Sequence, residues 1–385
     1  MLPILYPSNT NTSGFFNHNG LGFFNRCLKC EVTEETNGIY ELAMTILPSD
    51  RLAKTVVCGM FVKVKPNPHD NPQIFEIYAM SVEESKITIS GQHIHYLMNT
   101  NISIEPPVGG AADTPENLWS HMQIYFALTN LFSFSSDITS SHKILSSNNV
   151  NISLGEMLCG VVGSMVDIFG GELYYDNFTV SLLSRRGTDT GIALRYGSNI
   201  SSKKQDSDTQ TVYTHIAPYA YVTLKDLRNG NESSYYFFYN GSNHENTIAI
   251  PNSILTYEKV LSYDFTDRMQ NVVLREISEG NFENWQDVQD RLQEEAENYI
   301  SKYSAQLTQI SANVEIDLAE TLQGLQQCKL GDTVLIDFGD NGTTARAKII
   351  KTVYDSLEEK YIKMELGQPK KTIADMITVK NLGGA

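Results

Sequence analysis

The stretch "LQQCKLGDTVLIDFGDNGTTARAKIIKTVYDSLEEKYIKMELGQ", from Leu325 to Gln368, decides the fold of this chain. Apolar and polar residues alternate in three runs, which are separated by a glycine-rich turn and an acidic turn. Such alternation is typical of half-buried β-strands, so the stretch predicts a small barrel near the end of the chain. A weaker version of the same pattern runs from Val57 to Gln92. We therefore expect an internal repeat.

The two stretches share one order of elements. The early one has Gly59, "FVKV", a proline-rich loop, "IFEIYAM" and "SVEESKITISGQ". The late one has Gly331, "TVLI", a loop rich in glycine and asparagine, "RAKIIKTVYD" and "SLEEKYIKMELGQ". The final segments match best. A true repeat predicts two related barrels in one chain, whereas the alternative is that short strands resemble each other through patterning alone.

The first hundred residues alternate in the same strand-like manner. Two of the strands flank Asn37-Gly38, which is a strong hairpin signal. The pattern changes at "EPPVGGAADTPENLW", where Pro106, Pro107, Gly109 and Gly110 suggest a boundary.

Helices are predicted after this boundary. Asp113 and Glu116 form a capping-box pattern with Pro115 in the first turn, and Leu118, Trp119, Met122, Tyr125 and Phe126 continue it as an apolar stripe. Ser153 and Glu156 begin a second helix, which Gly170-Gly171 ends. A hairpin turning at Asp176-Asn177 follows. The region therefore predicts a small α+β domain.

A long helix is predicted close to the second barrel. Its apolar residues recur every three or four positions, at Trp285, Val288, Leu292, Ala296, Tyr299, Tyr303, Leu307 and Ile310. One stripe of this kind favours a helix packed on a barrel. A coiled coil between subunits is the alternative, but the stripe lacks strict heptads.

The predicted fold class is α+β and mostly β. It has two related β-barrel domains, a small inserted α+β domain and an additional helix. The predicted boundaries are 1–105 for the first barrel, 106–195 for the inserted domain, 196–280 and 314–370 for the second barrel, 281–313 for the helix and 371–385 for a C-terminal linker.

Composition narrows the classes of function. The chain has 385 residues and a net charge of −16, so it is a poor candidate for binding phosphate backbones or anionic lipid. Five cysteines argue against a secreted disulfide scaffold. The N-terminus lacks the basic residues of a signal peptide, and no segment has the roughly 20 apolar residues of a membrane span. We expect a soluble protein made in the cytoplasm.

Candidate metal ligands are sparse. Cys27 and Cys30 form one Cys-x-x-Cys, with Cys58 as the nearest further thiol, and residues three apart on a strand point to opposite faces. Buried small side chains are therefore the preferred interpretation. His93 and His95 share one face of a predicted strand, but a metal site would need another ligand. The sequence predicts no metal site.

Catalytic motifs are also lacking. The chain contains no Gly-x-Ser-x-Gly, no His-Glu-x-x-His and no Walker loop. Asp340, Glu358 and Glu359 lie in predicted turns, where solvated charge is expected. We interpret Arg185-Arg186 as a surface loop rather than a phosphate clamp. The sequence thus predicts no catalytic residue, no cofactor and no enzyme activity.

Several segments resemble one known family. They are "LRYGSNISSKKQDSDTQTVYTHIAPYA", then "VEIDLAET", "CKLGDTVLIDF" and "ARAKIIKTVYDSLEEKYIKMELG", with "YELAMTILPSD" and "PQIFEIYAMSVEESKITISGQHIHYLMN" near the N-terminus. In this order they resemble the prophage tail-endopeptidase or tail-associated lysin family, the tail-tip hub proteins of long-tailed phages. One departure is Thr214-His215, where that family often has Thr-Arg, so any role of the arginine is in doubt.

The resemblance implies a homotrimeric baseplate hub at the virion tail tip, made in the host cytoplasm. Its implied partners are a hexameric distal tail protein and the tape-measure protein, and phage DNA passes through without specific binding. Two barrels per chain would let three chains form a ring of six similar units (3 × 2 = 6). The alternatives are a cell-wall hydrolase, which would be a peptidoglycan-cleaving tail lysin, and a receptor- or carbohydrate-binding module using tyrosines such as Tyr239 in "SSYYFFYN". Longer members of the family carry a lytic or receptor-binding region after this module.

Overall fold

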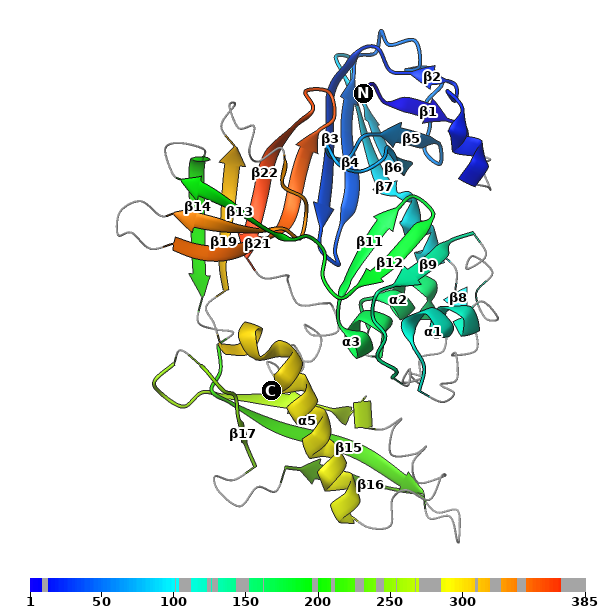
Figure 1. Ribbon diagram of the computed structural model, residues 1–385. Coiled ribbons are helices and arrows are strands. Elements are labelled where there is room, and N and C mark those ends of the chain that lie inside the picture. Colours follow the sequence, from blue (N-terminus) through cyan, green and yellow to red (C-terminus); the bar gives the residue numbers. More distant parts are fainter. Residues whose placement is uncertain are drawn as a thin grey trace.

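The computed structural model of the protein describes residues 1–8, 13–100, 102–103, 112–122, 126, 131–142, 152–161, 163–195, 200–208, 212–225, 232–239, 246–253, 255–266, 268–269, 285–308, 311–318, 327–337 and 344–367. Over these ranges the chain is α+β and mostly β, as predicted (Figure 1). The described helices include none with the length and hydropathy of a membrane span. Asp340 and the predicted linker 371–385 lie outside the described residues.

A 13-stranded sheet dominates the molecule. Its strands are β1 (Ile4–Tyr6), β2 (Gly22–Phe23), β3 (Cys27–Glu35), β4 (Tyr40–Ile46), β5 (Phe61–Val64), β6 (Gln73–Val82), β7 (Ile87–His93), β13 (Asp189–Arg195), β14 (Ile200–Asp208), β19 (Ser311–Leu318), β20 (Thr333–Asp337), β21 (Thr344–Asp355) and β22 (Lys360–Gly367). The hairpin predicted at Asn37-Gly38 joins β3 to β4, with Asn37 at φ 52°. Such a left-handed turn residue suits the twist of paired strands.

The predicted repeat is confirmed by the strand order. The strands of the first copy neighbour one another in the order β3-β4-β7-β6-β5-β1, and those of the second copy in the order β14-β19-β22-β21-β20-β13. The two orders correspond strand for strand. Figure 1 shows the copies side by side, because β21 of the second copy also pairs with β3 of the first. One difference is that β1 runs antiparallel to β5, whereas β13 runs parallel to β20.

Individual hydrogen bonds repeat as well. The backbone N–H of Gly59 donates to the carbonyl of Ile77 at 2.8 Å, and that of Gly331 donates to the carbonyl of Ile349 at 2.8 Å. Both glycines have positive φ, 83° and 92°, a conformation that glycine adopts without steric cost. Shared patterning alone does not predict the same hydrogen bond at equivalent glycines, so the repeat is structural.

Bulges interrupt equivalent strands at equivalent points. β6 has a bulge directly after Ile77, and β21 has one directly after Ile349. The first residues of β3 and β14 carry another matching pair, between Cys27 and Lys29 and between Ile200 and Ser202. Bulges re-aim the strand and fix its register, so the two copies share local geometry as well as topology.

The Gly-Gln ends of the two stretches do not occupy equivalent positions, contrary to expectation. Gly91 pairs with Ile77, but the residue that pairs with Ile349 is Leu366, one position before Gly367. A further bulge in the pairing of β21 with β22, between Tyr361 and Lys363, adds one residue to the second copy.

The strand pairing places two boundaries differently from the prediction. The predicted inserted domain ended at residue 195, but β13 pairs with β20 and lies in the large sheet. The predicted second barrel included residues 196–280, but four strands of that range form a separate sheet: β15 (His215–Lys225), β16 (Glu232–Phe238), β17 (Ile248–Ala249) and β18 (Val260–Asp264). Strand alternation identifies a strand but not its partner, which explains the error.

The helix α5 (Trp285–Thr308) covers this separate sheet rather than a barrel (Figure 1). Val288, Leu292, Ala296 and Tyr299 are buried with Ile216, Ala220, Val222 and Phe237 of the sheet, so the predicted apolar stripe is confirmed at those four positions. Trp285 is half exposed, and the side chains of Leu307 and Ile310 lie outside the described residues. The predicted helical range also ended too late, since β19 begins at Ser311. We call the sheet β15–β18 with α5 the α5 unit.

The inserted domain has a three-stranded sheet of β9 (Ser133–Ser136), β11 (Glu172–Asp176) and β12 (Thr179–Leu183), with helices α1 (Pro115–Met122), α2 (Leu154–Leu158) and α3 (Met165–Phe169). Its core continues into the first copy through Tyr6, Phe16, Phe61 and Ile74. The hairpin predicted near Asp176-Asn177 is β11–β12, and Asn177 in its turn has φ 52°. Smaller elements are η1 (Ser13–Asn17), η2 (Ile94–Thr100) and the pair β8 (Ile102–Ser103) and β10 (Ile152–Ser153).

Two helix predictions need correction. The capping box of Ser153 and Glu156 is present, but its helix α2 ends at Leu158 and a separate helix α3 follows, because Gly160 and Gly163 adopt positive φ between them. The helix α1 begins at Pro115, and the carboxylate of Asp113 accepts from the Asn117 side chain at 2.5 Å instead of capping in the predicted box.

Candidate functional site

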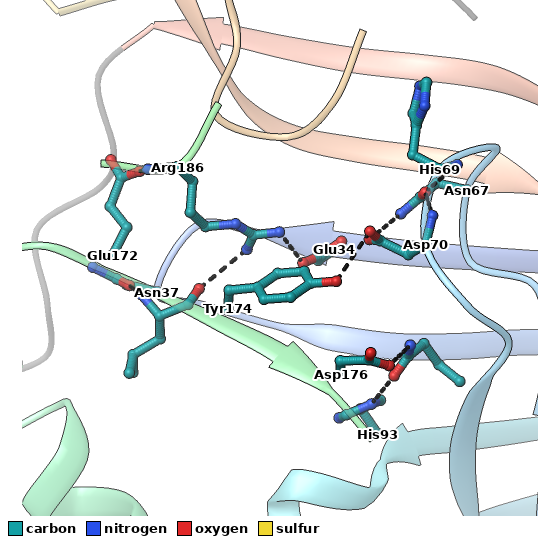
Figure 2. A network of polar contacts seen from close by, with 12 residues as sticks. Glu34, Asn37, Asn67, His69, Asp70, His93, Glu172, Tyr174, Asp176 and Arg186 are labelled. Atoms are coloured by element: carbon teal, nitrogen blue, oxygen red, sulfur yellow. Dashed lines mark hydrogen bonds and ion pairs between the residues drawn. The ribbon is translucent and has the colours of Figure 1, made fainter. Parts of the chain in front are cut away.

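A polar cluster that is buried at its centre and half-buried around it lies where the two copies and the inserted domain meet. We call it the junction (Figure 2). The hairpin β11–β12 and the segment after it supply one side, and the first copy supplies the other. Its members are Glu34, Asn37, Asp70, Gln73, Glu172, Tyr174, Asp176 and Arg186.

Arg186 is the centre of the junction. Its Nη2 lies 2.8 Å from Oε1 of Glu34, and its Nη1 donates to the carbonyl of Leu173 at 3.1 Å. Its guanidinium also lies over the ring of Tyr174, with 5.0 Å to the centroid. The side chains of Arg186 and Glu34 are only 7% and 6% exposed, so this is a buried ion pair between segments far apart in the sequence.

The charges of this pair depend on each other. Burial raises the pKa of Glu34, and Arg186 opposes that rise. Burial alone would lower the pKa of Arg186, but the carboxylate of Glu34 raises it. Removing one partner would therefore leave an isolated charge in a medium that solvates it poorly.

Tyr174 extends the network to the proline-rich loop of the first copy. Its hydroxyl donates to Oδ1 of Asp70 at 3.1 Å, and the other oxygen of Asp70 accepts from the Asn67 side chain at 2.7 Å. Burial raises the pKa of Tyr174, and Asp70 adds to the rise. The phenol therefore stays protonated and keeps donating.

Backbone groups of the hairpin are also bound by the first copy. Oδ1 of Asn37, in the β3–β4 turn, accepts from the N–H of Leu173 at 2.8 Å, and its Nδ2 donates to the carbonyl of Gly171 at 3.1 Å. Gln73 donates to Oδ1 of Asp176 at 2.7 Å and accepts from the N–H of Asn177 at 2.7 Å. Asn37 therefore both shapes its own turn and binds the inserted domain.

The second copy joins at the end of the hairpin. Glu172 accepts from the N–H of Arg186 at 2.7 Å through one oxygen and pairs with Lys348 of β21 through the other. Oδ1 of Asp332 accepts from the N–H of Thr188 at 2.7 Å. The junction thus ties the hairpin to both copies at once.

The junction was not predicted from the sequence. Arg185-Arg186 was expected in a surface loop, but only Arg185 is exposed, with its Nη2 donating to Thr333 at 2.7 Å. Arg186 is buried because its partner Glu34 lies 152 positions earlier in the chain. The sequence signal was a pair of arginines that begins two residues after Leu183, where the strand β12 ends.

The cysteine and histidine pairs also differ from expectation. The bulge in β3 breaks the alternation between Cys27 and Cys30, so their thiols interact instead of pointing to opposite faces. That contact with Cys30 lowers the pKa of the Cys27 thiol. Cys58 is exposed. Of the two histidines, only His93 ends the strand β7, while His95 belongs to η2.

The remaining candidates lie in ordinary structural positions. Thr214 and His215 bond each other, with 3.0 Å between Oγ1 and Nδ1, and Thr214 also donates to the Lys259 carbonyl. Glu358 and Glu359 are exposed in the turn before β22, as predicted. Among the residues that the structure describes, no three His, Cys, Asp or Glu side chains gather as a metal site would require. The hydrogen bonds and ion pairs of the junction join protein groups to one another. We therefore interpret the junction as a structural contact that holds the β11–β12 hairpin against the two copies.

Residues 188–377 match the sequence profile of the family described as prophage endopeptidase tail. The match covers 190 of the 385 residues, so the likeness to this family is shown for that segment alone. It includes the second copy and the α5 unit, whereas the first copy lies outside it. No curated protein matches the sequence.

Solved structures extend the likeness to the whole chain. The prophage tail protein gp18 from Listeria monocytogenes EGD-e has a TM-score of 0.60 and 16% identity, with 100% of each chain covered. The tail protein from Neisseria meningitidis MC58 has a TM-score of 0.55 and 9% identity, covering 97% of this chain and 98% of that one. The 43 kDa tail protein of prophage MuSo2 from Shewanella oneidensis has a TM-score of 0.52 and 11% identity, covering 89% and 94%. The whole chain therefore has the fold of these prophage tail proteins.

Proposed function

We propose that this chain is the hub of a phage tail tip, in which three copies form a ring that closes the tail tube and opens for DNA. One observation carries the proposal. The contact that joins the two copies within the chain, β21 with β3, has an equivalent pair of edges, on β6 and β14, that face no strand in the described part of the chain.

The correspondence can be followed residue by residue. Within the chain, Lys351–Tyr354 of β21 pairs antiparallel with Val32–Glu35 of β3. The equivalent residues are Ala79–Val82 of β6 and Gln205–Asp208 of β14, because the pairings and bulges of these strands match. Repeating the same contact between neighbouring chains, β6 to β14, would continue the sheet from one molecule to the next.

The free edge of β6 has the character of an interface. Val82 is 72% exposed and Tyr78 is 50% exposed, on an edge of β6 that pairs with no strand in the described part of the chain. Exposed edges of this kind invite pairing with another chain. Because each chain supplies two similar units, three chains would close a ring of six, which would meet a sixfold partner without a symmetry mismatch.

This arrangement fits the remaining expectations. A hexameric distal tail protein on one side and the tape-measure protein on the other are the partners that we propose, at the virion tail tip. The net charge of −16 favours a passage that repels phosphate, so that DNA slides through without binding.

A disulfide between chains tests the register. Thr36 N–H donates to the Ile350 carbonyl and Ser356 N–H to the Cys30 carbonyl, which makes Thr33 and Val353 a non-hydrogen-bonded pair. Such pairs bring the Cα atoms closest. Their equivalents are Asp206 and Ser81. We therefore expect the double variant Ser81→Cys, Asp206→Cys to form covalent trimers under oxidising conditions, seen on non-reducing gels.

The matched control shifts one cysteine by one residue. In the variant Ser81→Cys, Ser207→Cys the second cysteine lies on the opposite face of β14, so we expect little cross-linking. Equal cross-linking of both variants, or a lack of any covalent oligomer, would argue against the proposed pairing.

An exposed aromatic face supports a second candidate, a receptor- or carbohydrate-binding surface. On the side of the α5 unit away from α5, Tyr221, Tyr236 and Phe238 are 43%, 62% and 48% exposed. The ring centroids of Tyr221 and Tyr236 are 4.7 Å apart, and those of Tyr236 and Phe238 are 6.1 Å apart. Aromatic side chains with a polar tip suit surfaces that are partly wet. Tyr239, singled out from the sequence, follows Phe238 in the chain and is half-buried.

Glycan-array binding distinguishes this candidate. If the row is a sugar platform, the protein binds a host glycan and Tyr236→Ala abolishes the binding, while Tyr257→Ala, at a 59% exposed tyrosine outside the row, leaves it unchanged. An array without any bound glycan would leave the hub as the sole proposed function.

A further inference from the structure

A buried pair of histidines connects the first copy to the inserted domain. His93 is 0% exposed and His95 is 8% exposed. Their Nδ1 atoms are 2.8 Å apart, and Nε2 of His93 lies 3.0 Å from Oε1 of Gln73. Gln73 in turn binds Asp176 and the backbone of Asn177 in the β11–β12 hairpin.

The hydrogen bonds fix the proton on each ring. Oε1 of Gln73 can only accept, so Nε2 of His93 carries a hydrogen and its Nδ1 is the acceptor. The backbone N–H of His95 points at the same Nδ1, at 3.3 Å. Nδ1 of His95 must therefore carry the hydrogen that lies between the rings. Because its Nδ1 accepts, His93 is neutral, and burial disfavours a second proton on His95.

Aromatic rings close the site on both sides. His93 stacks on Tyr40 of β4, with centroids 4.4 Å apart, and His95 stacks on Tyr175 of β11, with centroids 3.8 Å apart. The stack on Tyr175 lies directly across the boundary between the first copy and the inserted domain. A change in the charge of His95 would therefore change a contact between the first copy and the inserted domain.

The titratable neighbours offer the rings no counter-charge. They are Tyr40 on β4, Tyr96 on η2, Tyr175 and Asp176 on β11 and Cys159 at the end of α2. Burial raises the pKa of all three tyrosines, which keeps them neutral. The carboxylate of Asp176 is bound by Gln73 and not by a ring. A proton on either histidine would therefore be an unpaired buried charge.

We propose that His93 and His95 form an acid-sensitive lock that holds the β11–β12 hairpin on the first copy. A proton on Nδ1 of His93 removes the acceptor that His95 uses and sets two N–H groups against each other. Nε2 of His93 keeps its hydrogen, so this repulsion acts on Gln73, and through it on Asp176 and Asn177, by displacing the His93 ring. The lock concerns the joint between two parts of one chain, so it operates whatever assembly the chain belongs to.

The direction of the pH effect follows from comparing two states of the β11–β12 hairpin: docked, which means bound to the first copy, and undocked, which means released from it. Burial, and for His93 also the neighbouring His95, lowers the pKa of both rings below the usual 6.5, to about 3 for His95. An undocked hairpin leaves rings with ordinary pKa values, which take up protons below about pH 6.5. Docking is thus strongest above that pH, and it weakens by about tenfold per pH unit for each histidine as the pH falls towards 3.

Hydrogen exchange measures the lock directly. Protection factors, corrected for the intrinsic exchange rate, are followed for the hairpin peptides 172–183 from about pH 7.5 to about pH 5. We expect hairpin protection to fall by at least about tenfold between pH 6.5 and pH 5.5. The peptides 215–225 of the α5 unit serve as an internal reference and are expected to change less.

Variants separate these histidines from other effects of acid. In His93→Gln, His95→Phe the stack on Tyr175 can persist while neither residue titrates, so hairpin protection is expected to become independent of pH. His69→Gln, at an exposed histidine, is expected to behave like the natural protein. Unchanged hairpin protection in the natural protein between pH 6.5 and 5.5 would overturn the proposal, as would an equally steep fall in the double variant. If the double variant does not fold, the proposal is tested in the natural protein alone. There the loss of protection in peptides 172–183 must exceed the loss in peptides 215–225 between pH 6.5 and 5.5, and equal losses would overturn the proposal.

Discussion

Replacing Arg186 with methionine is expected to destabilise the folded protein by about 3–5 kcal/mol. Methionine fills much of the same space, but the carboxylate of Glu34 is then left buried without its partner 2.8 Å away. The bond from Nη1 to the carbonyl of Leu173 is lost as well. Urea unfolding followed by circular dichroism measures the change in the free energy of unfolding.

A matched variant at an exposed arginine is the control. Arg346 pairs with Asp189 at 2.5 Å, but these side chains are 68% and 40% exposed. Water solvates both charges, so Arg346→Met is expected to cost less than about 1 kcal/mol. If the two substitutions lower the free energy of unfolding equally, the buried pair of Arg186 and Glu34 does not hold the hairpin on the first copy as proposed. The double variant Arg186→Met, Glu34→Gln is expected to recover part of the loss, because it removes the unpaired charge.

The second large effect is expected at a glycine that the repeat duplicates. Gly331→Ala should destabilise the protein by about 3 kcal/mol or more. A Cβ at this position would lie 2.7 Å from the backbone carbonyl carbon of Arg186, and φ is +92°. Backbone atoms at the junction cannot move away easily, so steric overlap adds to the strain of the left-handed conformation.

The equivalent glycine of the first copy provides the control within the same chain. Gly59 has φ +83°, but the nearest atom to its Cβ would be the Cβ of Ser8 at 4.0 Å. Gly59→Ala therefore carries only the conformational penalty of about 1–2 kcal/mol. Unfolding curves of the two variants measure the difference. Equal costs would mean that the second copy is not packed against Arg186 as described.

The repeat could be predicted from sequence because its evidence is local. Strand alternation and turn residues recur in the same order in both stretches, and the equivalent glycines Gly59 and Gly331 occupy the same backbone position. Local signals also identified the Asn37-Gly38 hairpin and the capping box at Ser153, since each depends on residues a few positions apart.

Other features of the fold and of the junction could not be predicted, because they depend on contacts between residues that are far apart in the sequence. Alternation in β15–β18 marks strands, but it does not indicate that they leave the large sheet and pack under α5. Arg186 follows a strand in a polar context that is typical of surface loops, and only the fold brings Glu34 to it. The histidine pair depends in the same way on Gln73 and on the end of β7 at His93.

The mass of the protein in solution tests the central claim most directly. The duplicated unit predicts that β6 of one chain pairs with β14 of the next until three chains close a ring. Light scattering coupled to size exclusion, over a wide range of concentrations, should therefore give the mass of three chains of 43.1 kDa each and no larger species. A mass of one chain at the highest concentration, or an open series of growing oligomers, would contradict the account.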